Sequence, residues 1–308
     1  MTFLFKSEAR RGEVWRRRLT AEFPGLEFRV WPDTGDPLDV KYLACWIPPE
    51  NLGKTFPNLE LVISVGAGVD QIDLGSLPAS VTVVRMTEPG LAAGMSEFGT
   101  LAVLAAHRDL PAYLSQQRDR AWTQLPAVAA KDRTVGVMGL GVLGTGLIES
   151  LRPFGFKLNG WSRSRKRVEG VTTFAGNDEL GAFLSSTDIL VCLLPLTGET
   201  RGILNAATFE ALPVGASLIN IGRGGHLVEQ DLLDGLASEH LRCAILDVAS
   251  VEPLPADHAF WTHPRIVLTP HIASVTNAEG GAEFVVESLR RHFAGQTLTG
   301  VVDVLRGY

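Results

Sequence analysis

A glycine-rich turn restricts the possible folds of this chain more than any other segment. Gly139, Gly141 and Gly144 occupy the first, third and last places of GLGVLG, after an apolar run (134–139) and before a helical pattern (143–151). In a strand–turn–helix unit such glycines permit a tight turn, close approach of a bound group and close helix packing. The unpaired N–H groups at a helix start favour an anion. The turn therefore predicts a dinucleotide pyrophosphate site, with an ordinary ligand-free turn as the alternative.

The surrounding region alternates short apolar runs with helical stretches, which indicates an α/β fold with a mostly parallel sheet. Six strands are expected within it, about the size of one complete doubly wound nucleotide-binding domain. They are 134–139, 156–161, 188–194, 216–222, 243–248 and 265–270.

The first third of the chain shows a second, smaller series. Strands are expected at 2–6, 26–31, 41–47 and 59–65, with a helix at 8–23. A long helix is expected to start near Met95, with Pro111 kinking or dividing it.

The C-terminal segment after His271 is mostly one helix, 276–293, and buries too little surface to fold alone. We expect it to return to the N-terminal domain. The sequence thus predicts a discontinuous substrate domain (1–97 and 275–308), a nucleotide-binding domain (98–274) and a cleft between them.

Composition narrows the class of protein. The 308 residues are 45% hydrophobic and carry a net charge of −6, which argues against a disordered chain and a basic nucleic-acid-binding surface. Cys45, Cys192 and Cys243 lie in apolar runs, as reduced core cysteines do, and no Cys/His spacing suggests a metal. The N-terminus lacks a signal-peptide core, and the longest apolar run, 189–196, is too short to span a membrane. We expect a cytoplasmic protein with no membrane partner.

The segment from Ser150 to Val168 contains no acidic residue, although NAD sites place an Asp or Glu about 20 residues after the turn. Ser162 stands where that acid would be, and Arg163 follows it. Arginine is the best planar partner for a 2′-phosphate, so the segment favours NADP over NAD; a solvated basic loop is the alternative. The segment holds six cations: Arg152, Lys157, Arg163, Arg165, Lys166 and Arg167.

Three further segments make a family resemblance visible: INIGRGGHLVEQDLL (219–233), AILDVASVEPLP (244–255) and LTPHIAS (268–274). Together with GLGVLG they resemble the D-2-hydroxyacid dehydrogenase family over nearly the whole chain. The resemblance implies two doubly wound parallel-sheet domains, a Rossmann nucleotide-binding domain and a smaller flavodoxin-like domain. The glyoxylate/hydroxypyruvate reductase A branch is the most similar, on WSRSRK (161–166), CWIPP (45–49) and LRGY (305–308).

The resemblance assigns catalysis to Arg223, Glu252 and His271. His271 would protonate the new oxygen, since histidine titrates near physiological pH. Glu252 would orient its ring and favour the imidazolium. Arg223 would hold the substrate carboxylate and polarise the keto oxygen. Taken singly, these residues could instead be a loop arginine, a turn glutamate and a structural histidine.

Further site residues follow from the same resemblance. Ala67 and Gly68, in VGAGVDQID (65–73), would bind the substrate carboxylate through N–H groups, and Trp46 would either cap the pocket or belong to the core. Trp122 would be part of a dimer contact or of the core, and His226 surface or structural. The cofactor set is Gly139, Gly141, Val142, Leu143, Gly144, Ser162, Arg163, Ser164, Lys166, Leu194, Pro195, Thr200, Ile221, Gly222, Asp247 and Ala273.

The function expected from these residues is the NADPH-dependent reduction of small 2-keto acids, glyoxylate and hydroxypyruvate, to D-2-hydroxy acids by a homodimer. A dehydrogenase for another D-2-hydroxy acid is one alternative. A nucleotide-sensing co-repressor is the other, and the acidic net charge argues against it.

Overall fold

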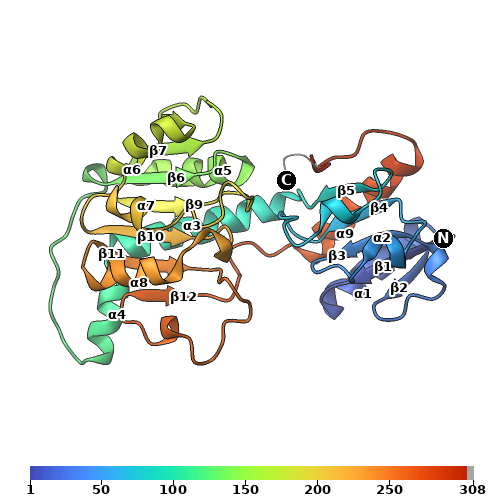
Figure 1. Cartoon of the computed structure of the whole chain (residues 1–308), viewed down its shortest axis with the longest axis horizontal. Coiled ribbons are helices and arrows are strands. Elements are labelled where there is room, and N and C mark those ends of the chain that lie inside the picture. Colours follow the sequence, from blue (N-terminus) through green and yellow to red (C-terminus); the bar gives the residue numbers. More distant parts are fainter. Residues whose placement is uncertain (304–308) are drawn as a thin grey trace. The chain divides into compact units, whose positions relative to one another are not determined.

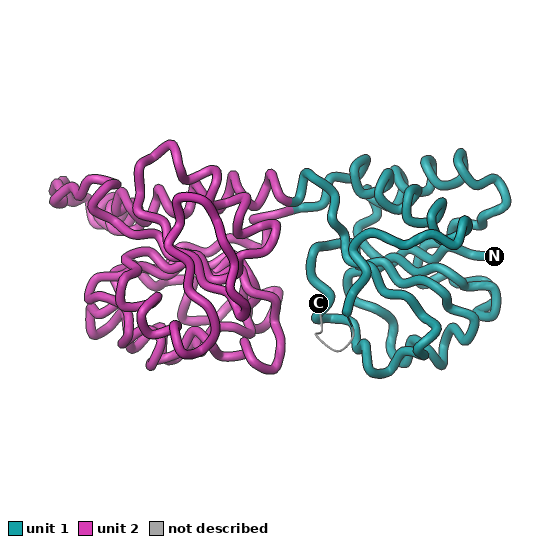
Figure 2. Tube along the Cα trace, turned by 90° about the horizontal axis from the view of Figure 1, so that it is seen from above, with its two compact units in different colours: residues 1–91, 275–308 teal, residues 92–274 magenta. Residues whose placement is uncertain are grey.

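Each of the two units of this chain is built on one parallel β-sheet (Figures 1 and 2). The computed structural model describes residues 1–303, so the LRGY ending (305–308) lies outside the described residues. Unit 1 comprises residues 1–91 and the segment that starts at Val275, and unit 2 comprises Ala92–Ser274. The chain returns from unit 2 to unit 1 after Ser274, the expected place. It first enters unit 2 after Leu91, six residues before the expected 97/98 boundary.

The sheet of unit 1 has the strand order β2-β1-β3-β4-β5, the flavodoxin-like order 2-1-3-4-5. Four of its strands match sequence-predicted runs, whereas β5 was not predicted. Helix α9 returns from the C-terminal segment to pack on α1 of this unit, as expected, and the indole of Trp15 donates to the Ala278 carbonyl at 3.0 Å. The elements are β1 (Thr2–Lys6), α1 (Ala9–Glu22), β2 (Glu27–Val30), β3 (Val40–Cys45), α2 (Leu52–Thr55), β4 (Leu61–Ser64), β5 (Thr82–Arg85) and α9 (Ala278–Phe293).

The sheet of unit 2 has the order β12-β11-β10-β9-β6-β7-β8. Numbered within the unit this is 7-6-5-4-1-2-3, a Rossmann sheet with one strand added. Six strands match the predicted runs and the edge strand β8 was missed. The strands are β6 (Thr134–Met138), β7 (Lys157–Ser162), β8 (Thr172–Ala175), β9 (Ile189–Cys192), β10 (Ala216–Asn220), β11 (Leu241–Leu246) and β12 (Ile266–Leu268); the helices are α3 (Pro89–His107), α4 (Leu110–Arg118), α5 (Val142–Leu151), α6 (Leu180–Ser185), α7 (Ala206–Glu210) and α8 (Glu229–Ala237).

Alternating side chains of the unit 2 strands enter two hydrophobic clusters, one on each face of the sheet. Leu190 and Cys192 of β9 belong to one cluster, whereas Ile189 and Val191 belong to the other. Helices cover both faces, so the strands are apolar on both sides and read as continuous hydrophobic runs. This burial makes the strands easy to find in the sequence.

The long helix expected near Met95 is two helices, and it starts earlier. Helix α3 begins at Pro89, where a missing N–H and a fixed φ suit the first helical position. The break falls at Asp109, which has a left-handed φ of 56°, and Pro111 lies in the first turn of α4. Pro111 therefore starts the second helix and does not kink the first.

Between residues 1 and 303, no helix is both long enough and apolar enough to cross a membrane. The three cysteines are buried and unbridged, as expected for core thiols. Burial raises the pKa of the Cys192 thiol to about 12.

Candidate active site

The three expected catalytic residues follow adjacent parallel strands of unit 2. Arg223 comes after β10, Glu252 after β11 and His271 after β12. Parallel strands bring their carboxyl ends to one edge of the sheet, where α/β folds bind ligands. There His271 Nδ1 lies 2.7 Å from Glu252 Oε2. Glutamate and histidine therefore form a pair, as the sequence predicted.

The environment of Glu252 keeps its carboxylate charged. Partial burial opposes ionisation, but hydrogen bonds from His271 and the Ala249 N–H, and the charges of His271 and Arg223, outweigh it and lower the Glu252 pKa. The lowered pKa favours the charged carboxylate, which can stabilise a protonated imidazole.

The backbone at His271 has a left-handed φ of 56°, which costs about 1–3 kcal/mol for a non-glycine residue. Asp247, buried at the end of β11, supports this turn. Its carboxylate accepts hydrogen bonds from Thr269 Oγ1 at 2.6 Å, Ile272 N at 2.8 Å and Ala273 N at 2.7 Å. Its backbone carbonyl accepts from the His271 N–H at 2.8 Å. Asp247, expected at the cofactor, therefore also fixes the histidine turn.

Arg223 is held through its backbone as well as its side chain. Its Nη1 donates to the Gly222 carbonyl at 2.8 Å. The buried Asn220 amide donates to the Arg223 carbonyl at 3.0 Å, and the Arg223 N–H donates to His226 Nδ1 at 3.1 Å. Sequence reasoning missed Asn220; its only signal is a polar side chain at the end of a buried strand.

The glycine-rich turn has the geometry expected of a pyrophosphate cradle. Gly139 has a φ of 109°, and a Cβ there would lie 2.7 Å from the Leu193 carbonyl oxygen. A Cβ on Gly144 would lie 1.8 Å from the Gly139 oxygen. At Gly141 a Cβ would meet nothing within 4 Å, and no side chain caps the start of α5. The fold itself thus requires Gly139 and Gly144, whereas the open space at Gly141 fits a bound dinucleotide.

Two cations of the basic segment after β7 have different partners. Arg165 pairs with Glu179 and donates to the Thr173 carbonyl. Lys166 Nζ instead donates to the Leu140 carbonyl of the glycine-rich turn at 2.8 Å. Lys166, one of the expected cofactor residues, therefore contacts the glycine-rich turn, whereas the Arg165 guanidinium is engaged by Glu179.

Ser162 and Arg163 follow β7 directly. The buried Ser162 hydroxyl donates to the Ser164 carbonyl at 2.8 Å. Arg163 is exposed, and its Nη1 lies 3.9 Å from Glu199 Oε2, on the loop after β9. Sequence reasoning missed this carboxylate because it lies 36 residues away along the chain, outside the acid-free segment.

The loop after β9 is closed by its own hydrogen bonds. Thr200 Oγ1 donates to the Pro195 carbonyl at 2.7 Å and accepts from the Thr197 N–H. Among the other expected cofactor residues, the side chains of Leu194, Ile221 and Ala273 are buried, while Val142 is exposed at the start of α5 and Leu143 is half-buried. Leu194, Ile221 and Ala273 therefore present mainly backbone to a ligand.

The expected substrate loop of unit 1 follows β4. Ser64 Oγ donates to the Gly68 carbonyl at 2.6 Å, which closes the loop around Ala67. The Trp46 ring packs on Gly66, where a Cβ would lie 2.8 Å from it. Trp46 is half-buried and thus belongs both to the core and to this loop.

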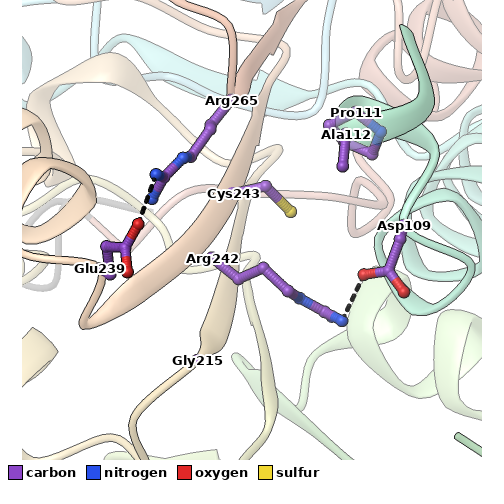
Figure 3. Close-up of a pocket in the computed structure, with 8 residues that line it drawn as sticks. All are labelled: Asp109, Pro111, Ala112, Gly215, Glu239, Arg242, Cys243 and Arg265. Carbon is purple, nitrogen blue, oxygen red and sulfur yellow. Dashed lines mark hydrogen bonds and ion pairs between the residues drawn. The ribbon is translucent and has the colours of Figure 1, made fainter. Parts of the chain in front are cut away.

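A cavity of about 270 Å³ lies elsewhere, at the opposite edge of the unit 2 sheet (Figure 3). Arg242 and Arg265 point into it, and they pair with Asp109 at 2.5 Å and Glu239 at 2.9 Å. Both cations at this cavity thus have acidic partners within the same unit. Within residues 1–303, no cluster of three or more His, Cys, Asp or Glu side chains could hold a metal ion.

Comparison with known proteins shows similarity over the whole chain. Residues 100–273 match the model of the D-isomer specific 2-hydroxyacid dehydrogenase NAD-binding domain. A glyoxylate/hydroxypyruvate reductase A of Serratia proteamaculans is 40% identical over the full length of both chains.

Two solved structures are similar over the whole chain, each with a TM-score of 0.91. A D-isomer specific 2-hydroxyacid dehydrogenase of Xanthobacter autotrophicus Py2, in complex with NADPH and MES, is 39% identical and covers 100% of this chain and 99% of its own. An NADPH-dependent glyoxylate/hydroxypyruvate reductase of Sinorhizobium meliloti, in complex with NADP and sulfate, is 37% identical with the same coverage.

Proposed function

This chain belongs to the D-isomer specific 2-hydroxyacid dehydrogenase family, in its glyoxylate/hydroxypyruvate reductase A branch, and we propose that it reduces small 2-keto acids to D-2-hydroxy acids with NADPH. It is an NAD(P)-dependent oxidoreductase. The observation that carries the proposal is the Glu252–His271 pair beside Arg223 at the carboxyl edge of a Rossmann sheet. Glyoxylate and hydroxypyruvate are the proposed substrates because the reductases similar to this chain carry those names.

In the proposed mechanism, a nicotinamide cofactor held by the glycine-rich turn would, when bound, supply the hydride for the keto carbon. Arg223 binds the substrate carboxylate and polarises the keto oxygen. His271 already contacts Glu252 through Nδ1, so Nε2 is the ring nitrogen assigned to protonate that oxygen. Glu252 keeps the ring oriented and stabilises its charged form.

The remaining contacts are assigned to backbone groups. The N–H groups of Ala67 and Gly68 bind the substrate carboxylate, and Trp46 supports their loop through Gly66. The glycine-rich turn and the start of α5 bind the pyrophosphate. Asp247 contacts the carboxamide end, close to the turn that carries His271.

We further propose a preference for NADPH over NADH. Arg163, with Ser162, Ser164 and Lys166, binds the 2′-phosphate, and the acid-free segment removes the usual ribose acceptor. Support comes from Lys166, which lies against the glycine-rich turn. The solved structures of X. autotrophicus and S. meliloti hold NADPH and NADP.

A homodimer is proposed because the segment between α4 and residue 130 exposes apolar side chains. Trp122 is fully exposed within the chain, so the alternative core role is wrong, and Val128 is also exposed. The segment is held on α4 by bonds from the Leu125 N–H to Tyr113 Oη and from the Thr123 N–H to Gln116 Oε1. A tryptophan buries about 150–250 Å² when a partner covers it, so its full exposure favours a covered position in an assembly. We also propose that the protein is cytoplasmic. Its three cysteines are buried and unbridged, which fits a reducing compartment.

A panel of 2-keto acids tests this function. NADPH oxidation is followed at pH 7 with glyoxylate, hydroxypyruvate, pyruvate and bulkier 2-keto acids, and the product configuration is determined. The proposal expects turnover with glyoxylate and hydroxypyruvate, and a D product where C2 is a stereocentre. Binding of NADPH without oxidation by any substrate would instead favour a nucleotide sensor.

A further inference from the structure

His226 is one of the most deeply buried polar residues of unit 2, although the sequence suggested a surface or structural histidine. Its relative exposure is 0%, and it ends the short turn Gly224–His226 that follows Arg223. Burial excludes the surface role. The chemistry of its ring shows what the structural role is.

The two ring nitrogens of His226 have fixed and opposite functions. The Arg223 N–H donates to Nδ1 at 3.1 Å, so Nδ1 carries no proton. In a neutral imidazole the proton then lies on Nε2, which donates to the Pro195 carbonyl at 3.3 Å. The ring therefore connects the backbone of the catalytic arginine with the loop after β9 that is assigned to the cofactor.

Close packing leaves this ring little freedom. A Cβ on Gly222 would lie 3.2 Å from Cε1 and Nδ1 of His226. A Cβ on Gly224 would lie 1.9 Å from the Ala249 carbonyl, so the turn packs directly on the segment that leads to Glu252. The Ala249 N–H in turn donates to Glu252 Oε1 at 3.0 Å. The turn thus joins the ends of β10 and β11, where two of the three catalytic side chains begin.

We propose that His226 is a positioning residue that fixes Arg223 relative to Glu252 through its unprotonated Nδ1. The inference rests on the proposed reductase function, because it concerns the same arginine. Asn220 holds the Arg223 carbonyl from the other side, and His226 holds the N–H, so both peptide groups of Arg223 are anchored by buried side chains. Loss of the His226 bond lets the peptide rotate, and small misplacements of a binding group cost about 100-fold in rate.

Two conservative variants test the two ring nitrogens of His226 one at a time. In H226N the Asn Oδ1 takes the place of Nδ1 and accepts from the Arg223 N–H, while the bond to Pro195 is lost. In H226Q the Gln Nε2 takes the place of the ring Nε2 and donates to Pro195, while the Arg223 N–H loses its acceptor. H226L lacks both bonds. H240Q is the matched control, since His240 Nε2 contacts the Leu212 carbonyl at the opposite edge of the sheet.

The measured quantities are kcat, the KM of the keto acid, the dissociation constant of NADPH and the Tm. H226L and H226Q are expected to lose about 10- to 100-fold in kcat/KM for the keto acid. H226N is expected to recover most of that loss, although its Tm falls as far as that of H226Q. H240Q, whose Gln Nε2 keeps the donor to the Leu212 carbonyl, is expected to keep wild-type kinetic constants. Equal kinetic losses in H226N and H226Q, or wild-type kinetics in H226Q, would overturn the proposal.

A measurement without turnover separates this inference from the proposed function. In ¹⁵N-histidine-labelled wild-type protein, two-bond ¹⁵N–¹H spectra distinguish the two neutral tautomers, and the His226 signals are those lost in H226N. The proposal requires a proton on Nε2 and none on Nδ1; the reverse tautomer contradicts it. If the wild-type protein reduces none of the keto acids, the proposed function fails while the tautomer still tests the geometry.

Discussion

At the scale of single residues, the Glu252–His271 pair determines how the proposed reaction depends on pH. Reduction requires a protonated His271, and the negative charge of Glu252, whose pKa is lowered, favours that form. In Glu252→Gln the charge is gone while the side-chain shape is kept. The rate of reduction should therefore begin to fall at a lower pH than in the wild-type enzyme. A pH–rate profile of kcat/KM that is unchanged in Glu252→Gln would contradict the pairing.

Removal of the histidine itself has a larger consequence. His271→Ala should lower kcat by about 10²- to 10⁴-fold, the usual range for a general acid, while NADPH binding persists. Stopped-flow turnover and NADPH fluorescence titration measure the two effects. His292→Ala is a suitable control, because His292 pairs with Glu60 in unit 1, outside the unit that carries the catalytic set.

The 2′-phosphate site offers a second test at this scale. Glu199 lies 3.9 Å from Arg163, so its charge competes with a phosphate for that guanidinium. Glu199→Gln should lower the KM for NADPH, by a factor of a few because the pair is exposed, and leave the KM for NADH nearly unchanged. Arg163→Ala should raise the KM for NADPH. A Glu199→Gln variant that binds both cofactors more tightly by equal factors would exclude a role at the phosphate.

The sequence identified the residues whose chemistry is local. Arg223, Glu252 and His271 could be named because their motifs and the strand ends that carry them are contiguous in the chain. Glu199, Asn220 and His226 could not, because their roles depend on which loops the sheet order brings together. Asp247 was predictable only in part. Its place near the cofactor was expected, but its hydrogen bonds to the His271 turn depend on backbone conformation, which the sequence does not reveal.

At the scale of elements, two glycines of the glycine-rich turn have different roles: one is needed for stability and the other for cofactor binding. Gly139→Ala places a Cβ 2.7 Å from the Leu193 carbonyl at a positive φ, so it should lower stability by roughly 1–3 kcal/mol. Gly141→Ala meets open space and has an ordinary φ of −84°, so its Tm should stay close to wild type. Its added methyl group should nevertheless weaken NADPH binding. Thermal unfolding with and without NADPH checks both; full NADPH stabilisation of Gly141→Ala would show that no pyrophosphate approaches there.

The interior strands of both sheets were all predicted, and both missed strands lie at a sheet edge. The strand β9 is a run of buried apolar residues, whereas β8 is an edge strand of exposed and half-buried residues. The missed strand β5 is only four residues long, with two of them half-buried. Burial strengthens the hydrophobic pattern, so edge strands are harder to find, although the edge strands β2 and β12 were predicted.

At the scale of the whole molecule, the segment around Trp122 predicts the assembly. If a second copy covers this side chain, Trp122→Ser should weaken the dimer and give a monomer at micromolar concentration. Sedimentation velocity measures the change. Val214→Ser is the control, because Val214 is also highly exposed but lies on the turn before β10. A wild-type protein that sediments as a monomer would contradict the proposed dimer.

The combination of an intact catalytic set and an acid-free cofactor segment is central to the account. Steady-state oxidation of NADPH and NADH by the unmodified protein, at pH 7 with saturating glyoxylate, tests both at once. One charge-assisted hydrogen bond to a 2′-phosphate, about 1.5–3 kcal/mol, corresponds to about a 10- to 10²-fold higher kcat/KM with NADPH. Equal values for the two cofactors, or no oxidation of either, would contradict an NADPH-dependent reductase.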